Sequence, residues 1–382
     1  MEEYCKTILS IPNNRSKFYR DYKKNEYSQR KALICAYYLT QYYPTEKNNL
    51  WWGKGTTEWT NVSKSVPQYA GHYQPKLPGE LGFYDLRLPE NMYRQIDLAT
   101  NYGVDAFAFY YYWFNGERAL EHPLDMFLEH QDMDIQFCVC WCNEDWTKRY
   151  SGTNNEVLLS IGKTQESYIR FIDDVIPLFK DKRYLKIDNK FVLIIYRPSE
   201  IPKCQETIIR WREKVKQETG ADLYLIASQE RRIISNWVKR GFNAVSQFQP
   251  ASCIDFSNEI TKNMHIIREK YYGHVYDYEH TAKDAISYLN KGDKIYPAVM
   301  PMWDNTSRRD DSGVIFENSS PELYRKWLDD AIKYVSDNAN LEANIVFINA
   351  WNEWGEGAYL EPDRAYGYAY LEETYKANCH YR

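Results

Sequence analysis

Residues 89–112 have the sequence PENMYRQIDLATNYGVDAFAFYYY, and this stretch contains both building units of the fold. Pro89 followed by Glu90 is typical of a helix start, because the first helical turn leaves its backbone N–H groups unpaired and proline has none. Gly103 marks the end of that helix. The run 104–112 is short, aromatic and apolar on both faces, which is typical of a strand covered on both sides. The stretch therefore predicts a helix over 89–102 that leads into a buried strand.

The same alternation continues along the chain. Further helices are predicted over 166–179, 204–219, 282–289 and 321–336, with Gly220 ending the second and Ser320 capping the last. Eight strand candidates lie at residues 32–38, 104–112, 135–142, 191–196, 223–228, 244–248, 295–302 and 345–350. This pattern predicts the α/β class and a (β/α)8 TIM barrel, with long βα-loop insertions after strands 1 and 6. A doubly wound sheet is the alternative, but it usually carries a glycine-rich turn after its first strand, and residues 38–42 (YLTQY) contain no glycine.

The composition of the chain disfavours several classes of function. The 382 residues carry a net charge of −5 without a basic run, which disfavours a nucleic-acid partner. The sequence contains no long apolar run, so no transmembrane segment is expected. The N-terminus lacks an apolar signal region, so a cytoplasmic location is expected, with a periplasmic or secreted location as the alternative if a leader peptide has been removed. Cys138, Cys140 and Cys142 alternate along one predicted strand, where they are expected to pack in the core as small apolar side chains. This use of cysteine is in keeping with a reducing compartment. We expect one catalytic domain over residues 31–382, preceded by a peripheral N-terminal segment, 1–30.

The last predicted strand opens onto residues 351–357, WNEWGEG. Glu353 and Glu356 are two carboxylates three residues apart, and breaking a glycosidic bond needs such a pair, one to give a proton and one to act as base or nucleophile. Trp351 and Trp354 offer flat apolar faces that would suit a sugar ring. Plain packing at a strand end is the alternative explanation of this segment.

Aromatic and polar residues also follow other predicted strands, and the chain holds 35 Tyr and 12 Trp. Functional loops of a (β/α)8 barrel follow the carboxyl ends of its strands, so these residues are expected to share one rim and form a sugar pocket. For each of them, packing, helix capping or ion pairing is the structural alternative. The substrate-binding candidates are Trp52, Glu58, Trp59, His72, Tyr73, Tyr112, Trp113, Trp141, Asn143, Glu144, Trp146, Arg197, Trp303, Asp304, Trp351, Asn352 and Trp354.

The sequence signals for other kinds of site are weaker. The DxD pattern of residues 132–134 precedes its strand rather than following it, which favours a solvated turn over a metal-binding site. The seven histidines show no metal-ligand spacing. The sequence has neither a GxSxG elbow nor a phosphate-binding glycine loop.

Several long blocks of the chain resemble the WbsX-like family. They are residues 51–62, 71–90, 110–116, 140–149, 301–309, 346–363 and 366–372. The similarity runs in order from about residue 32 to residue 373. Proteins of this family occur in bacterial polysaccharide gene clusters, are often labelled glycosyltransferases, and are related to glycoside hydrolase family 99.

The resemblance implies a (β/α)8 barrel that acts on α-linked, mannose-like sugars without a metal or nucleotide cofactor. In family 99 a Glu-Trp-x-Glu motif follows strand eight. Its first Glu acts as base on the substrate 2-hydroxyl, and its second acts as general acid and then base. The matching positions here are Glu353 and Glu356, with Gly355 at the variable position. The blocks upstream match the WbsX-like group rather than the family 99 enzymes.

Residues and resemblance together predict a carbohydrate-active enzyme that cleaves or transfers an α-linked glycosidic bond of an oligosaccharide or polysaccharide. Hydrolysis with participation of the substrate 2-hydroxyl is the first hypothesis. A glycosyltransferase or transglycosidase in bacterial surface-polysaccharide (O-antigen or capsule) biosynthesis is the second. A sugar-binding protein without catalysis is the third.

Overall fold

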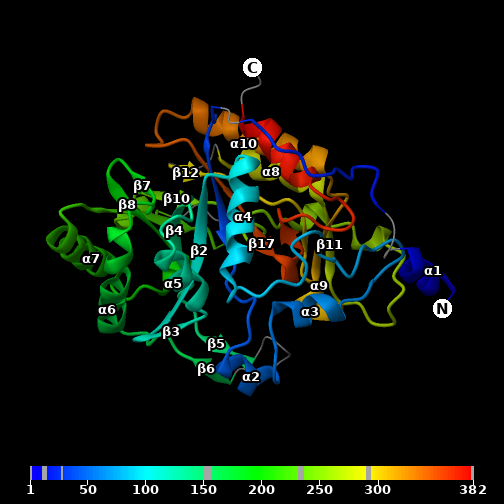
Figure 1. The fold of residues 1–382 in the computed structure, drawn as a ribbon, viewed down its shortest axis with the longest axis horizontal. Coiled ribbons are helices and arrows are strands. Elements are labelled where there is room, and N and C mark those ends of the chain that lie inside the picture. The colour runs from blue at the N-terminus through cyan, green and yellow to red at the C-terminus, as the bar shows by residue number, and fades with distance from the viewer. Residues whose placement is uncertain are drawn as a thin grey trace.

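The computed structural model describes residues 2–10, 15–26, 29–148, 156–230, 236–289 and 294–379. A ring of parallel strands lies at its centre (Figure 1). In order around the ring the strands are β1 (Leu33–Tyr38), β2 (Ala106–Phe114), β4 (Gln136–Trp141), β8 (Lys190–Ile195), β9 (Leu223–Ser228), β10 (Ala244–Ser246), β12 (Ile295–Tyr296), β13 (Ala298–Val299) and β16 (Ile345–Ile348). The strands are buried almost throughout, which explains why their sequences are apolar on both faces.

The seventh strand closes the ring in two pieces. β12 pairs with β10 on one side, and β13 pairs with β16 on the other. Pro297 separates the two pieces because it has no backbone N–H to donate to a ladder, although its carbonyl still accepts from Phe347 N at 3.0 Å. The predicted strand 295–302 is thus one strand that changes partner midway. Eight strands close the barrel, and the (β/α)8 prediction is confirmed.

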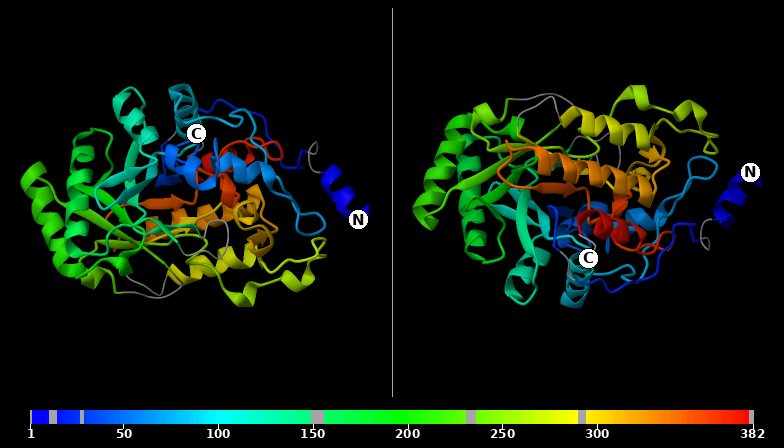
Figure 2. Two further views of the ribbon diagram at one scale, coloured as in Figure 1. Left: turned by 90° about the horizontal axis from the view of Figure 1, so that it is seen from below. Right: turned by 90° about the horizontal axis from the view of Figure 1, so that it is seen from above.

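Helices surround the barrel (Figure 2). They are α4 (Pro89–Asn101), α5 (His122–Glu129), α6 (Gln165–Val175), α7 (Cys204–Thr219), α8 (Tyr278–Leu289), α10 (Pro321–Asp337) and α11 (Ala369–Asn378). The predicted helix ends hold to within a residue or two at α4, α7 and α10. α6 stops earlier than predicted and continues as the 3-10 helix η2 (Ile176–Lys180), and α8 begins four residues before its predicted start. The short helices α5 and α11, of eight and ten residues, were not predicted.

The insertion after β1 carries two short helices, α2 (Glu46–Trp52) and α3 (Glu58–Lys64). Beyond β10 and β13 a separate three-stranded sheet forms, in the order β11 (His274–Asp277), β15 (Val314–Glu317) and β14 (Trp303–Asp304). The long insertions predicted after strands 1 and 6 are therefore present. Both lie on the side of the barrel to which the strands' carboxyl ends point.

Several short strands and short helices lie in the loops. The two-stranded pairs are β5 (Trp146–Thr147) with β6 (Val157–Leu159) and β17 (Asn352–Glu353) with β18 (Ala358–Tyr359). β3 (Glu117–Ala119) and β7 (Lys186–Ile187) pair antiparallel with β2 and β8. The short helices are α9 (Thr306–Arg309), η3 (Pro198–Glu200), η4 (Val238–Arg240), η5 (Phe256–Asn258), η6 (Thr261–Asn263), η7 (Asp310–Ser312) and η8 (Trp354–Glu356). In the part of the chain that the structure describes, no helix combines the length and the apolar character needed to cross a bilayer.

The N-terminal segment has two parts. The helix α1 (Glu2–Ser10) lies at one end of the molecule, apart from the barrel helices (Figures 1 and 2). Residues 15–26, by contrast, are tied to the loop before α11: Ser16 N donates to Ala365 O at 2.8 Å, and Tyr368 N donates to Arg20 O at 2.9 Å. Only the first part extends away from the domain.

Candidate active site

Four charged side chains meet beyond the carboxyl ends of the barrel strands. The Arg308 guanidinium donates from Nε to Glu58 Oε1 at 2.6 Å, from Nη2 to Glu353 Oε2 at 2.7 Å and from Nη1 to Glu356 Oε1 at 2.7 Å. Glu58 begins α3 after strand one, Arg308 lies in α9 after strand seven, and the other two glutamates follow strand eight. Residues about 300 positions apart in the sequence thus form one cluster.

The backbone around Glu353 is held by the side chain of its neighbour, Asn352. The Asn352 amide accepts from Leu39 N at 2.7 Å and donates to Leu39 O at 3.0 Å, which ties the strand-eight exit to the strand-one exit. The hydroxyl of Tyr42 donates to Asn352 O and accepts from Trp354 N. Asn352, predicted to bind substrate, is fully buried and holds the loop in place.

Burial sets the acidity of the two strand-eight glutamates. It raises the pKa of Glu353 to about 8 against the opposing charge of Arg308, and the carboxylates of Glu356 and Glu58 raise it further. Burial also raises the pKa of Glu356, again against Arg308. Both pKa values are raised, so the pair as a whole can hold a proton to donate near neutral pH.

Tyrosines surround the acid pair. Tyr110 and Tyr112 in β2 and Tyr196 after β8 have raised pKa values, first because removal from water disfavours the charged form and second because each lies near the negative charge of at least one of the two acids. Tyr112 is half-buried, and its ring contacts the half-buried Trp146 with centroids 5.1 Å apart. A partly accessible aromatic surface therefore runs towards the acids.

Six predicted tryptophans are covered by protein instead of forming open platforms. They are Trp59, Trp113, Trp141, Trp303, Trp351 and Trp354, all buried. Trp354 stacks on Tyr359 at 3.7 Å between centroids, and Trp141 stacks on Phe171 of α6 at 3.6 Å. The expectation that Trp351 and Trp354 present free faces to a sugar is therefore corrected, because apolar indoles at strand ends gain more from packing under the loops and helices.

The exits of strands three and four are joined by two predicted residues. Asn143 is fully buried, and its amide donates to Arg197 O and accepts from Arg197 N, each at 2.7 Å. This places Asn143 as a structural link between two loops. The Arg197 side chain pairs with Glu144 at 3.2 Å, and both keep exposed surface. The predicted candidates that retain accessible surface are Trp52, Tyr73, Tyr112, Glu144, Trp146 and Arg197.

His72 and Asp304 form a second buried polar group beside the acid cluster. His72 Nδ1 accepts from Gln68 N at 3.0 Å, which leaves Nε2 to donate to Asp304 at 2.8 Å. Burial would raise the pKa of Asp304, but His72 and the Lys76 ammonium outweigh it and hold that pKa well below its usual range. A Cβ on Gly357 would lie 2.7 Å from Lys76 Cε, so this group supports the segment after Glu356 at close range.

Another buried acid, Glu361, contacts the ring of Trp354, the residue after Glu353. Its carboxylate accepts from Trp354 Nε1 and Gln95 Nε2, each at 2.6 Å, and from Tyr84 Oη at 3.0 Å. Burial nevertheless raises the pKa of Glu361 to about 7, against these donors. It holds the Trp354 ring in place and is itself 2 % exposed.

Sequence reasoning missed Arg308, Tyr42, Tyr110, Tyr196 and Glu361. Arg308 had a signal, because two arginines follow strand seven in the block 301–309. The tyrosines had none, since a chain with 35 of them offers no way to choose. Within the ranges described, no group of His, Cys, Asp and Glu is arranged to hold a metal ion.

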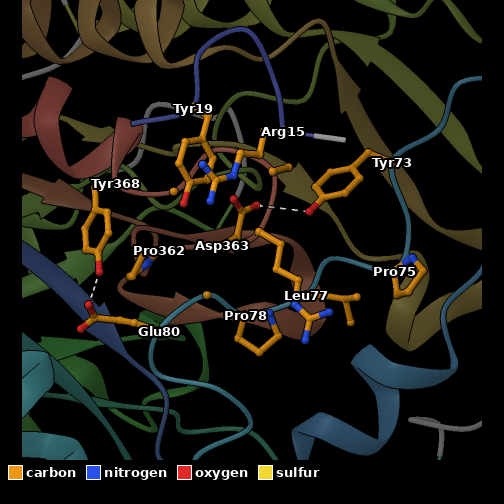
Figure 3. A pocket seen from close by; sticks show the side chains of 14 residues that line it. Arg15, Tyr19, Tyr73, Pro75, Leu77, Pro78, Glu80, Pro362, Asp363 and Tyr368 are labelled. Carbon is orange, nitrogen blue, oxygen red and sulfur yellow. Dashed lines mark hydrogen bonds between the residues drawn. The ribbon is translucent and has the colours of Figure 1, made fainter. Parts of the chain in front are cut away.

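A cavity of about 520 Å³ opens elsewhere, between the N-terminal segment and the loop before α11 (Figure 3). Its lining includes Tyr73, whose hydroxyl lies 3.5 Å from Asp363, and Tyr368, which donates to Glu80. None of its lining residues belongs to the acid cluster. Tyr73, predicted to bind substrate, thus lines this cavity, which lies apart from the carboxylates of the acid cluster.

The chain matches the family model described as "Glycosyltransferase WbsX" over residues 34–374. It is 38 % identical over 351 residues to "Uncharacterized protein WxcX" of Xanthomonas campestris pv. campestris strain B100, and the same protein of strain ATCC 33913 matches equally. The match covers 91 % of this chain and 49 % of the relative. The chain thus spans about half the length of the curated relatives it matches.

Two solved structures show the same fold at low sequence identity. A "Glycoside hydrolase-like protein" superposes with a TM-score of 0.60 at 15 % identity, covering 98 % of this chain and 99 % of that one. The GH99 endo-alpha-mannosidase from Bacteroides thetaiotaomicron superposes with a TM-score of 0.57 at 14 % identity, covering 90 % and 96 %. These likenesses concern the barrel fold.

Proposed function

The chain belongs to the Glycosyltransferase WbsX family, and from that premise we propose that it is an enzyme acting on an α-linked glycosidic bond through Glu353 and Glu356. The observation that carries the proposal is the convergence of both carboxylates on the single Arg308 guanidinium, beyond the carboxyl ends of the barrel strands. The likeness in fold to the GH99 endo-alpha-mannosidase supports an α-mannose-like substrate.

In the proposed reaction Glu356 gives its proton to the leaving oxygen while Glu353 takes the proton of the substrate 2-hydroxyl. The bond between the anomeric carbon and the leaving oxygen breaks, and a bond from the 2-oxygen to the same carbon forms. Water or a second sugar hydroxyl then opens this ring as Glu356 takes its proton and Glu353 returns one to the 2-oxygen. Protons balance over the two steps, so the acids end as they began.

Exposure supports this division of roles. The Glu356 side chain is 23 % exposed and the Glu353 side chain 6 %, which places Glu356 nearer the open side, where a leaving group must depart. Because the two acids share one guanidinium, their titration belongs to the pair, and the raised pKa of Glu353 does not by itself name the donor.

Hydrolysis and transglycosylation differ in the acceptor of the second step, whereas a glycosyltransferase also takes an activated sugar as donor. Transfer in surface-polysaccharide assembly is the second candidate, favoured by the description of the matching family as a glycosyltransferase. A panel of aryl α-glycosides, with and without sugar acceptors and nucleotide sugars, separates the two by product. Saturable sugar binding without any product would leave a binding protein.

Replacing either acid tests the proposal. Glu353→Gln and Glu356→Gln should each lower turnover by about 10²–10⁴-fold, because each removes one proton-transfer group. Circular dichroism and the thermal midpoint should show that both variants remain folded. Near-normal turnover in both would remove the acid pair from the mechanism.

A further inference from the structure

We infer that Arg308, anchored by Glu58, is a positioning residue that holds Glu353 and Glu356 as a pair and sets their charge balance. The inference rests on the proposed function, since it concerns how those two acids are prepared for catalysis. Neither Arg308 nor Glu58 needs to touch the reacting atoms for this role.

The geometry uses every nitrogen of the guanidinium. Nε, Nη1 and Nη2 each contact a different carboxylate at 2.6–2.7 Å, and the Arg308 side chain is only 15 % exposed. A planar fork with fixed donor directions can hold three acceptors in set positions, whereas an ammonium is a single point charge. The contact to Glu58 lies on the Nε side and leaves both terminal nitrogens for the catalytic pair.

The surrounding backbone is built to keep this contact. The Glu58 side chain has no exposed surface, and its Oε1 lies where a Cβ on Gly355 would be, at 1.5 Å. Glycine at 355 is therefore required by the close approach of the anchor. On the opposite side Arg308 N donates to Asn305 O at 3.1 Å, and Asn305 Oδ1 accepts from Val314 N at 2.7 Å, which ties α9 to β15.

The charge balance follows from the groups that face the two acids. They are Glu58, Arg308, Arg309, Tyr42, Tyr110, Tyr112, Cys142 and Tyr196. Burial raises the pKa of each of these tyrosines and of Cys142, so they are neutral near pH 7. The three carboxylates and two arginines decide how many protons the pair holds.

Removing the charge of Arg308 and removing the charge of Glu58 should shift the pH profile in opposite directions. Without the Arg308 charge, ionising either acid is harder, so Arg308→Gln should move the bell-shaped kcat/KM profile to higher pH by about 1–3 units. Glu58→Gln removes a negative charge, so its profile should move to lower pH. Arg308→Lys keeps the charge but cannot fix three carboxylates in the positions that the planar guanidinium sets, so its profile should stay in place while kcat falls by up to about 10²-fold.

The experiment measures these profiles together with the ¹³C-carboxyl NMR titration of the ligand-free variants, assigned with Glu353→Gln and Glu356→Gln. Arg87→Gln, which removes a surface arginine paired with Asp85, is the matched control and should leave both titration and profile unchanged. Opposite shifts for Arg308→Gln and Glu58→Gln support the inference. No shift, or shifts in the same direction, would overturn it.

The test still decides the inference if Arg308→Gln does not fold or if the wild-type protein shows no turnover. If Arg308→Gln does not fold, Glu58→Gln and Arg308→Lys still decide the sign of the charge effect and the separate cost of losing the fork. If the wild-type protein turns over no glycoside, the proposed function fails, and the NMR titration alone decides whether Arg308 and Glu58 set the charge of the pair.

Discussion

Gly355 shows how much of the site depends on one residue. A methyl group at this position would overlap the Glu58 carboxylate, so the glycine lets a buried acid from the first insertion reach the segment after strand eight. Gly355 does not have a positive φ, so glycine is required here for space and not for its backbone conformation. The residue at the variable position of the Glu-Trp-x-Glu motif is thus constrained by a partner nearly 300 positions away.

Glu361 carries a prediction about stability. Its pKa is about 7 in the folded protein and 4.5 as an ordinary glutamate, so the folded state binds its proton more tightly. The stabilisation from this proton is complete below about pH 4.5 and is lost as the pH rises to about 7, a change of about 3 kcal/mol. Glu361→Gln should flatten the pH dependence of the unfolding free energy between pH 5 and 7, measured in denaturant, while the exposed Glu129→Gln should not.

At the scale of elements, strand alternation decides which aromatic residues face the acids. Tyr112 and Trp113 are neighbours on β2, and consecutive side chains of a strand point to opposite faces. Tyr112 lies near Glu353, whereas Trp113 packs against Phe171 of α6. The sequence places both at the same rim, and only the register of the strand separates their roles.

Two tryptophans make this difference measurable. Trp141 is fully buried on Phe171, so Trp141→Ala should lower the unfolding free energy by about 3–5 kcal/mol and leave KM of the folded enzyme unchanged. The half-buried Trp146 contacts Tyr112, so Trp146→Ala should cost less stability and raise KM. Denaturant unfolding and steady-state kinetics check both. A raised KM for Trp141→Ala would restore its predicted place in the sugar site.

At the scale of the whole molecule, the barrel brings the exits of strands one, seven and eight to one place. The ring closes because strand seven pairs on both sides despite Pro297. The insertions after strands one and six lie at that end, and the segment 15–26 is bonded to residues 365–368 in the loop before α11. The acid cluster exists only once the ring is closed.

Truncation tests how the N-terminal segment contributes. Deleting residues 2–10 removes α1, which an exposed ion pair between Glu3 and His265 links to the domain, so the free energy of unfolding should change by about 1 kcal/mol or less. Deleting residues 2–26 also removes the backbone bonds to residues 365–368 and should lower the thermal midpoint clearly. Equal midpoints for the two truncations would show that residues 2–26 are peripheral, as the sequence suggested for the segment 1–30.

The sequence by itself determined the barrel and the two strand-eight acids, because alternating apolar runs, helix start and stop signals and a local motif depend on neighbouring residues. The tertiary structure decided that Arg308 and Glu58 join those acids and that Trp351 and Trp354 lie buried. Those outcomes depend on contacts between distant segments and on which face of each strand end is covered. Local pattern places Glu58 and Arg308 after their strands, but it does not specify which side chains they contact or which indoles are covered.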